Sequence, residues 1–185
     1  VLSGETISSW ITGSSNGQVT LDQEKVAAFV ANLAAAYDTA GKMRIFTGVS
    51  GAEYQLTGPY GWKIDQAGEI AALTELIQSG SVWQNGDSAD REPVYSQSAA
   101  SRTGSDWGNT YVQVDLAGQH VYMIKDGACV WDASCVTGNV SKAYTTPDGI
   151  YSLTYKEKDR ILRGKKLDNG KYEYESHVDY WMPFN

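Results

Sequence analysis

The chain has 185 residues, of which 42% are hydrophobic and 20% are charged, and this composition is that of a folded protein with one or two small domains. Its 15 Lys and Arg residues against 22 Asp and Glu residues give a net charge of −7 at pH 7. A negative protein is repelled by nucleic acid backbones and anionic lipids, so we expect neither as a partner.

The first hundred residues have the pattern of a small α+β unit. Apolar residues recur at helical spacing after residue 20, which predicts a helix over 22–37 with Thr20 and Gln23 as its capping box. The predicted apolar face of this helix consists of Val26, Phe29, Val30, Leu33 and Tyr37.

A second helix is predicted from its N-cap, Asp65, to Ser79, where Gly80 ends it. Its inward residues are expected to be Ile70, Leu73, Leu76 and Ile77. Between the two helices, residues 43–47 and 53–56 are short enough to be strands separated by glycines.

Residues 96–109 are small, polar and Gly-containing, which is typical of a linker. We therefore expect one domain over 1–100, a linker over 101–109 and a second domain over 110–185. The second domain is predicted to be all-β, a sandwich or an open barrel, because no helical pattern follows Ser81.

Six strands are expected in the second domain, and the Asp126-Gly127 pair predicts a type I′ hairpin turn before the third of them. Another turn is predicted at 168–170. The expected strands cover residues 112–116, 121–124, 128–136, 149–155, 171–175 and 178–184.

Cysteine and histidine chemistry has few candidates in this chain. Cys129 and Cys135 lie six positions apart on one predicted strand, about 20 Å at about 3.3 Å per residue, which is too far for a mutual disulfide. They form no CxxC pair and no cluster with His120 or His177, so the sequence predicts no metal site. Without flanking glycines or a known nucleophile motif, we interpret all four residues as structural.

Two other residue classes leave alternatives open. The chain has six Trp and twelve Tyr but three Phe. This favours apolar surfaces in contact with water, as in sugar or peptide grooves, although core packing explains any single ring equally well. The carboxylate pairs Asp87 with Asp90 and Glu173 with Glu175 fit glycosidase chemistry only if each pair faces a common cleft, and otherwise they are surface charges.

Several blocks in the second half together resemble the opening half of the L,D-transpeptidase (YkuD-type) catalytic domain. Their order and spacing, with a hairpin turn, a VTGN bend and a TPDG turn, carry the resemblance. The blocks are TYVQVDLAGQ (110–119), HVYMIKDGACVWDASCVTGN (120–139), YTTPDGIYSL (144–153), ILRG (161–164) and VDYWMPFN (178–185).

The first half resembles the peptidoglycan-binding-type domain that commonly precedes this catalytic domain in Gram-positive enzymes. The two resemblances together imply an α+β domain followed by part of a β-sandwich. The matching blocks in the first half are VTLDQEKVAAFVANLAAAYDT (19–39), MRIFTG (43–48), YGWKIDQAGEIAALTELIQSG (60–80) and PVYSQSA (93–99).

The chain departs from the family pattern at its C-terminal end. In the family a catalytic His and then an SHGC-type motif with the nucleophilic Cys follow the strand that corresponds to VDYWMPF, whereas this sequence ends at Asn185. We therefore expect a truncated enzyme without catalytic residues or a cofactor, inactive by itself.

For the complete enzyme the resemblance implies a cysteine acyl transfer that forms 3→3 peptidoglycan cross-links. Trp181, Met182 and Phe184 are predicted to line the substrate pocket, with sandwich core as the alternative for Met182 and Phe184. The implied partners are peptidoglycan stem peptides and glycan. The implied location is extracytoplasmic, in the cell wall or anchored on the outer side of a Gram-positive membrane.

Two other functions remain open from the sequence. The chain could serve as a non-catalytic peptidoglycan-binding module, or as an unrelated hydrolase that uses Cys129 or Cys135. A half-sandwich would also expose an unpaired strand, so self-association through residues 178–185 is expected.

Overall fold

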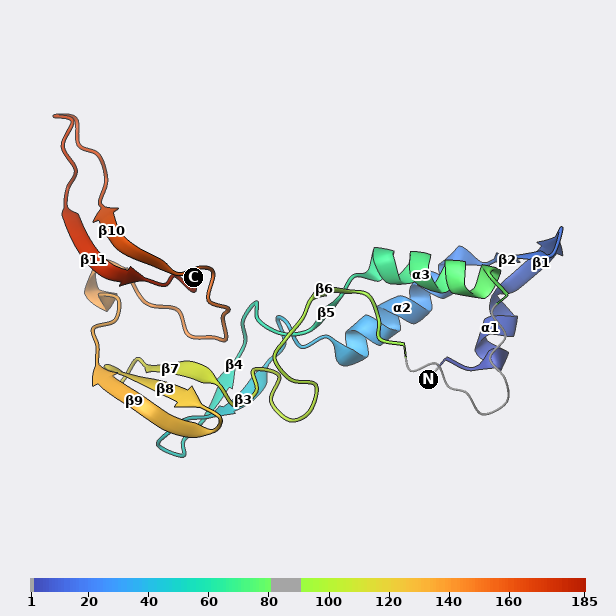
Figure 1. Ribbon diagram of the computed structural model, residues 1–185, viewed down its shortest axis with the longest axis horizontal. Coiled ribbons are helices and arrows are strands. Elements are labelled where there is room, and N and C mark those ends of the chain that lie inside the picture. The colour runs from blue at the N-terminus through green and yellow to red at the C-terminus, as the bar shows by residue number, and fades with distance from the viewer. Residues whose placement is uncertain (1, 81–90) are drawn as a thin grey trace.

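The protein has an α+β region followed by a mostly β region, spread along one long axis (Figure 1). The computed structural model describes residues 2–80 and 91–185. The fold class predicted from the sequence is therefore confirmed.

The first elements of the chain are α1 (Gly4–Trp10), β1 (Ile11–Ser15), β2 (Gln18–Leu21), α2 (Gln23–Tyr37), β3 (Arg44–Thr47), β4 (Glu53–Leu56), β5 (Lys63–Ile64), α3 (Gln66–Gln78) and β6 (Tyr95–Gln97). The later ones are β7 (Tyr111–Asp115), β8 (His120–Lys125), β9 (Ala128–Ser134), the 3₁₀ turn η1 (Val140–Lys142), β10 (Glu157–Arg163) and β11 (Glu175–Trp181).

Both predicted helices are present. The Asp65 side chain accepts a hydrogen bond from the Gly68 amide at the start of α3, which confirms the predicted N-cap. The capping box at Thr20 is wrong, because Asp22 caps α2 through the amides of Glu24 and Lys25. Thr20 is instead part of β2.

The two helices pack against each other and against β2 and β5 to form the main core. Trp10 and Phe29 pack edge to face with their ring centres 5.3 Å apart. Tyr37 was expected on the buried face but is 67% exposed, because it is the last residue of α2 and lies beyond the core. The buried apolar residues here are Trp10, Leu21, Val26, Val30, Ala34, Ile64 and Leu73.

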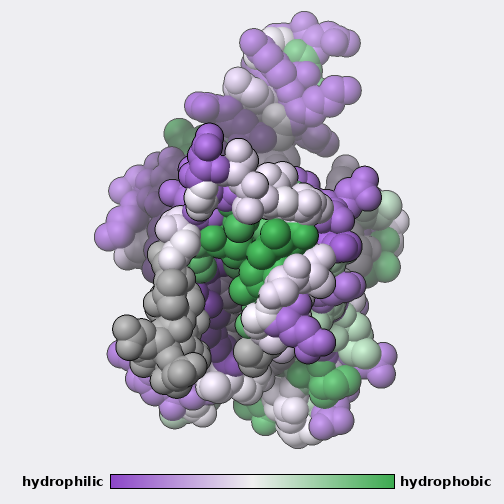
Figure 2. Space-filling view, turned by 90° about the vertical axis from the view of Figure 1, so that its right-hand side faces the viewer, coloured by the Kyte–Doolittle hydropathy of each residue, from purple (hydrophilic) through white to green (hydrophobic). Residues whose placement is uncertain are grey.

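The core comes close to the surface at the end of the molecule that carries α1 and the β1–β2 hairpin. Leu2, Val19 and Ile77 pack against the buried residues there but remain partly exposed. Figure 2, which views this end, shows hydrophobic side chains gathered at the centre of the face with hydrophilic ones around them.

The second half contains two separate antiparallel sheets, β7-β8-β9 and β10-β11. Asp126 and Gly127 have φ of 50° and 82°, as the predicted type I′ turn between β8 and β9 requires. Ile124 is the one buried apolar residue among residues 109–185 of the described chain. Both sheets therefore leave most of their side chains exposed.

Two strand predictions in this half need correction, and one strand was missed. Residues 149–155 form no strand; Ile150 instead exchanges backbone hydrogen bonds with the 57–60 loop, through Thr57 O (2.8 Å) and Tyr60 N (3.2 Å). Residues 171–175 were expected to be a strand, but 171–174 contain one isolated bridge, between Lys166 and Tyr172, and Glu175 already belongs to β11. The partner of β11 is instead β10, which was not predicted because its charged sequence EKDRILR does not alternate.

The connection at 101–109 packs against the N-terminal half through a buried ion pair. Asp106 is 6% exposed and accepts a hydrogen bond from Arg44 Nη1 at 2.6 Å and another from the Thr39 hydroxyl. Trp62 donates from its ring nitrogen to Ser101 O at 2.7 Å. The predicted linker residues therefore hold specific contacts with Thr39 just after α2, with β3 and with the 57–62 loop.

We expect Asp106→Ala to lower the free energy of unfolding by about 3 kcal/mol, because it leaves the buried Arg44 guanidinium without its carboxylate partner. The matched control is Glu175→Ala, which breaks the exposed pair with Arg163 and should cost less than about 1 kcal/mol. Urea unfolding followed by Trp fluorescence measures both. Equal losses in the two variants would show that the Asp106 pair is no more important than a surface pair.

Candidate functional site

The predicted pocket residues lie where β11 ends and the chain returns alongside residues 151–155. Trp181 is the last residue of β11, and its ring nitrogen donates to the Tyr155 hydroxyl at 3.2 Å. Arg160 on β10 donates to the same hydroxyl at 3.1 Å, and its guanidinium lies 6.0 Å from the Trp181 ring centre. The three side chains form an aromatic-cation cluster, which we call the Trp181 cluster.

The other two predicted pocket residues are more exposed. Met182 is 50% and Phe184 is 40% exposed. Phe184 packs on Tyr151 with ring centres 5.9 Å apart, and Pro183 O accepts a hydrogen bond from Thr154 N at 2.8 Å. The alternation expected for a strand does not apply, because β11 ends before Met182. Substrate binding by Trp181, Met182 and Phe184 stays a prediction.

The basic residues of the β10–β11 hairpin are paired with acidic ones. A hydrogen bond to Glu157 raises the pKa of Arg160, and one to Glu175 at 2.7 Å raises the pKa of Arg163. Lys158 lies over the Tyr180 ring, 5.4 Å from its centre. Arg160 and Arg163 therefore stay charged, and all three basic side chains are engaged within the hairpin.

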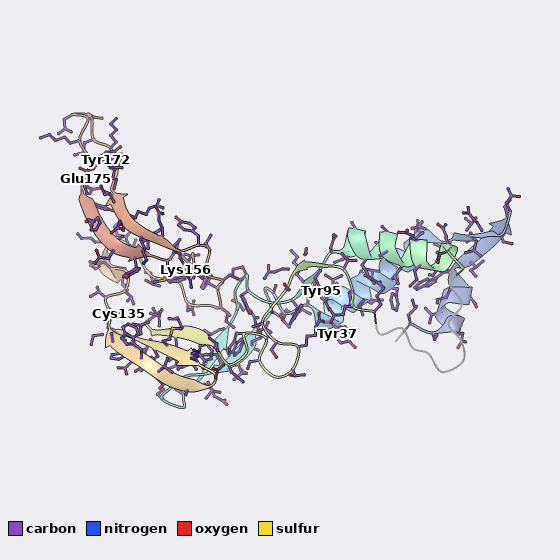
Figure 3. All side chains as sticks on the ribbon, in the orientation of Figure 1. Tyr37, Tyr95, Cys135, Lys156, Tyr172 and Glu175 are labelled. Carbon is purple, nitrogen blue, oxygen red and sulfur yellow. The ribbon has the colours of Figure 1, made fainter. Side chains whose placement is uncertain are left out.

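The two thiols and the two imidazoles are not brought together. Cys129 is exposed and Cys135 is partly buried, and both are free. Cys135 lies just past the end of β9, well away from Tyr172 and Glu175 on the long hairpin (Figure 3). Within the described residues, no hydrogen bond or ion pair joins either thiol to an imidazole.

Each imidazole has carboxylate partners instead. His120 Nε2 lies 2.7 Å from Asp132 Oδ1, and its ring packs on Tyr122 with centres 4.8 Å apart. His177 lies between Asp159 and Asp179 on the β10–β11 hairpin. A Cys–His pair for nucleophilic catalysis is thus not formed by these four residues.

The carboxylate pairs considered from the sequence do not define a glycosidase site. Asp87 and Asp90 lie outside the described residues. Glu173 and Glu175 are both exposed, and Glu175 is paired with Arg163. The cluster that the sequence did not indicate is Asp159, His177 and Asp179, because its members meet only through the register of β10 and β11.

An open groove of about 700 Å³ lies on the N-terminal unit between α3 and β2. Its polar lining includes Gln18, Gln23 and Gln78, and the Thr74 hydroxyl is buried there without a hydrogen-bond partner in the described part of the chain. The groove is separate from the β10–β11 hairpin.

The fold is an α+β unit followed by two small antiparallel sheets. Residues 109–184 match the L,D-transpeptidase catalytic domain family (YkuD). No curated protein matches the chain.

Solved structures extend the similarity over the whole chain. The crystal structure of a cysteine-to-serine mutant of the Enterococcus faecium L,D-transpeptidase is 31% identical, with a TM-score of 0.71, over 98% of this chain and 68% of that one. The structure of the Ldtfm-avibactam carbamoyl enzyme is also 31% identical, with a TM-score of 0.72, over 98% of this chain and 66% of that one. The chain belongs to the L,D-transpeptidase family.

Proposed function

We propose that this chain is part of a cell-wall enzyme that forms 3→3 peptidoglycan cross-links, and that the nucleophile is not among its residues. L,D-transpeptidases act on peptidoglycan stem peptides. In the proposed reaction a thiolate attacks the carbonyl after the third stem residue, the leaving residue departs, and an amine of a second stem takes the acyl group.

The position of the cysteines is the observation that carries this proposal. A nucleophilic thiol needs a base within hydrogen-bond reach, and neither Cys129 nor Cys135 forms such a contact within the described residues. The SHGC-type motif of the family does not occur in the 185 residues.

The exposed apolar face of the β7–β9 sheet supports the same reading. Cross-strand pairing aligns Val112 with Met123 and Met123 with Trp131, and these residues are 58%, 37% and 56% exposed. An apolar face of this kind is covered in a stable domain. We infer that further polypeptide of the catalytic domain packs on it.

We assign residues 1–100 to a peptidoglycan-binding-type domain and 110–185 to part of the catalytic domain, joined by 101–109. Trp181, Met182 and Phe184 would line one wall of the stem-peptide site. With this function the protein would be extracytoplasmic, in the cell wall or anchored on the outer side of the membrane of a Gram-positive bacterium. Of the helices in the described residues, none has the length and hydrophobicity that a membrane crossing needs.

A second candidate function is a non-catalytic peptidoglycan-binding module. The groove between α3 and β2 favours it, because its glutamine amides suit the hydroxyls and amides of glycan or peptide. A binding module would bind peptidoglycan by itself, whereas a fragment of the transpeptidase need not.

We expect no covalent adduct when the chain is incubated with excess carbapenem or avibactam, because neither thiol has a base within hydrogen-bond reach in the described residues. Intact-mass spectrometry measures the adduct. As a positive control, iodoacetamide under the same conditions should label the exposed thiol of Cys129. This labelling would show that a missing adduct is not due to an oxidised thiol. A stoichiometric adduct that Cys129→Ser or Cys135→Ser removes would overturn the proposed absence of a nucleophile.

Pelleting with purified sacculi tests the binding module. If the groove binds the wall, the chain should sediment with sacculi, and Gln18→Ala together with Gln23→Ala should weaken binding about tenfold by removing exposed polar partners. The matched control is Tyr37→Ala, a change on the exposed end of α2 outside the groove. Equal sedimentation of all variants, or none at all, would exclude this groove as a wall-binding site.

We propose self-association through residues 178–185, since β11 has an unpaired edge and Tyr180, Met182 and Phe184 are 64%, 50% and 40% exposed. Light scattering should give the mass of a dimer or a higher oligomer, and Tyr180→Lys with Met182→Lys should return the monomer. Tyr37→Lys, equally exposed on the other half, should leave the oligomer intact. A wild-type monomer at all concentrations would contradict this edge contact.

A further inference from the structure

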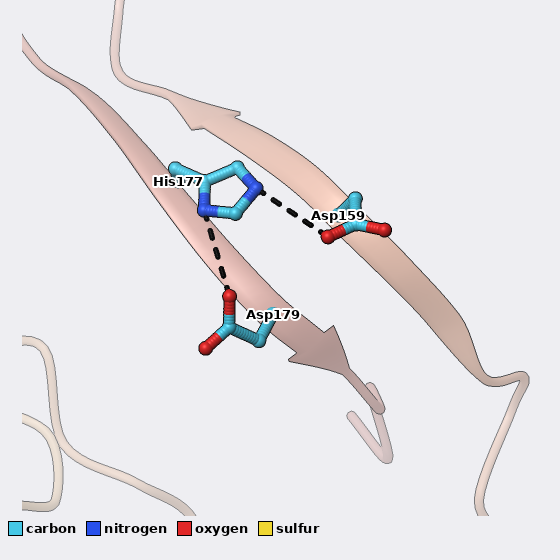
Figure 4. A group of neighbouring side chains, drawn as sticks. All are labelled: Asp159, His177 and Asp179. Atoms are coloured by element: carbon cyan, nitrogen blue, oxygen red, sulfur yellow. Dashed lines mark ion pairs between the residues drawn. The ribbon is translucent and has the colours of Figure 1, made fainter.

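Three side chains with metal-ligating atoms converge on the β10–β11 hairpin. Lys158 pairs with Tyr180 and Arg160 with Val178, so Asp159 lies opposite Asp179 between these two pairs. His177 precedes Asp179 by two residues on β11. Figure 4 shows the imidazole between the two carboxylates.

The distances within this cluster suit a bridging ion better than direct bonds. His177 Nε2 lies 3.7 Å from Asp159 Oδ1, and its Nδ1 lies 3.8 Å from Asp179 Oδ1. Both exceed hydrogen-bond length. Ligand atoms about 2.1 Å from a tetrahedral ion stand about 3.4 Å apart. The two distances from His177 start from different imidazole nitrogens, and a single ion binds one of them. With one nitrogen of His177 and one oxygen of each Asp, the three ligand atoms lie within 4.8 Å of one another, so the exposed side chains must rotate to bring them to this spacing.

The charge of the cluster also favours a cation. Like charges directly opposite each other on paired strands are unfavourable, and Asp159 and Asp179 are such a pair. In the described part of the chain no Lys or Arg forms an ion pair with either carboxylate. The nearest basic residues on β10 are engaged elsewhere, Arg160 with Glu157 and Lys158 over the Tyr180 ring.

We propose that Asp159, His177 and Asp179 form a surface site for a divalent transition metal, with Zn²⁺ as the best fit. One imidazole and two carboxylates are typical zinc ligands, and water would complete the tetrahedron. Ca²⁺ and Mg²⁺ demand six or more oxygen ligands and fit poorly. The side chains are 80%, 56% and 82% exposed, so the ion enters from solution and the affinity is modest.

A bound ion would cross-link the two strands of the hairpin. Its ligands come from both β10 and β11, and any ligand that binds only the paired state stabilises that pairing. The site lies on the same hairpin as the Trp181 cluster, so metal occupancy would also hold β11 against β10 near Trp181.

Isothermal titration of the tag-free chain with ZnCl₂ tests the site directly. We expect one saturable site, and Asp159→Asn and Asp179→Asn, which keep the side-chain shape, should each weaken binding about tenfold or more. His177→Ala should weaken it at least as strongly. Backbone NMR spectra establish that the variants are folded and should show zinc-induced shifts in β10 and β11.

The matched controls separate this site from other zinc ligands in the chain. His120→Ala removes the other imidazole, which faces the single carboxylate of Asp132, and should leave the affinity unchanged. Cys129→Ser with Cys135→Ser removes both thiols and should also leave it unchanged. MgCl₂ should give no saturable heat.

Two results would overturn the proposal. The first is no saturable zinc binding by about 1 mM, which corresponds to a binding free energy weaker than about −4.1 kcal/mol. The second is binding that survives Asp159→Asn, Asp179→Asn and His177→Ala but is lost in the His120 or cysteine variants.

Discussion

The arrangement of the whole chain depends on one buried carboxylate, Asp106, in the segment that connects the two halves. A buried carboxylate is costly unless it is paired and hydrogen-bonded, and Asp106 receives both the Arg44 guanidinium and the Thr39 hydroxyl. The Thr39 oxygen in turn accepts a hydrogen bond from the Trp62 amide at 2.9 Å. A segment whose composition is typical of a flexible linker is thereby fixed to Thr39, two residues after α2, and to the start of β3.

With this segment fixed, the first half supplies part of the environment of the second. The β3–β4 hairpin lies beside β7–β9, and the Gln113 side chain accepts a hydrogen bond from the Val49 amide at 3.0 Å (Figure 1). Gly58, at φ 148°, approaches Ile150 so closely that a Cβ would lie 2.3 Å from its carbonyl oxygen. The N-terminal unit is therefore packed against the catalytic-domain sheet and is not merely tethered to it.

Local signals in the sequence predicted α2 and α3, whereas the short α1 was missed although its Ser3 cap is local. Contacts distant in the sequence account for the misses in the second half. The Asp65 cap, the 3.6-residue periodicity and the Asp126-Gly127 turn act within a few residues, so they can be read without the fold. Residues 149–155 look like a strand, but Ile150 uses its backbone groups on the 57–60 loop. Asp159 and Asp179 lie 20 positions apart and meet only through the β10–β11 register, which no local pattern specifies. Trp181 could be singled out from the sequence because of the family resemblance. Its contacts with Tyr155 and Arg160 could not be predicted, because they depend on the same long-range pairing.

The two halves differ in what stabilises them, and this difference bears on function. The apolar burial of the described chain is concentrated around α2 and α3, with Ile124 as the one fully buried contribution from residues 109–185. The β10–β11 hairpin is instead stabilised by its ladder, by exposed ion pairs such as Arg163 with Glu175, and by cation-aromatic contacts. Exposed ion pairs contribute at most about 1 kcal/mol each. Because these contributions are small, the stability of the hairpin should rise markedly when packed polypeptide, substrate or an ion binds both of its strands. Trp181 is the last residue of β11 and contacts Tyr155. The pairing of β10 with β11 therefore determines where the Trp181 side chain lies in the proposed stem-peptide site.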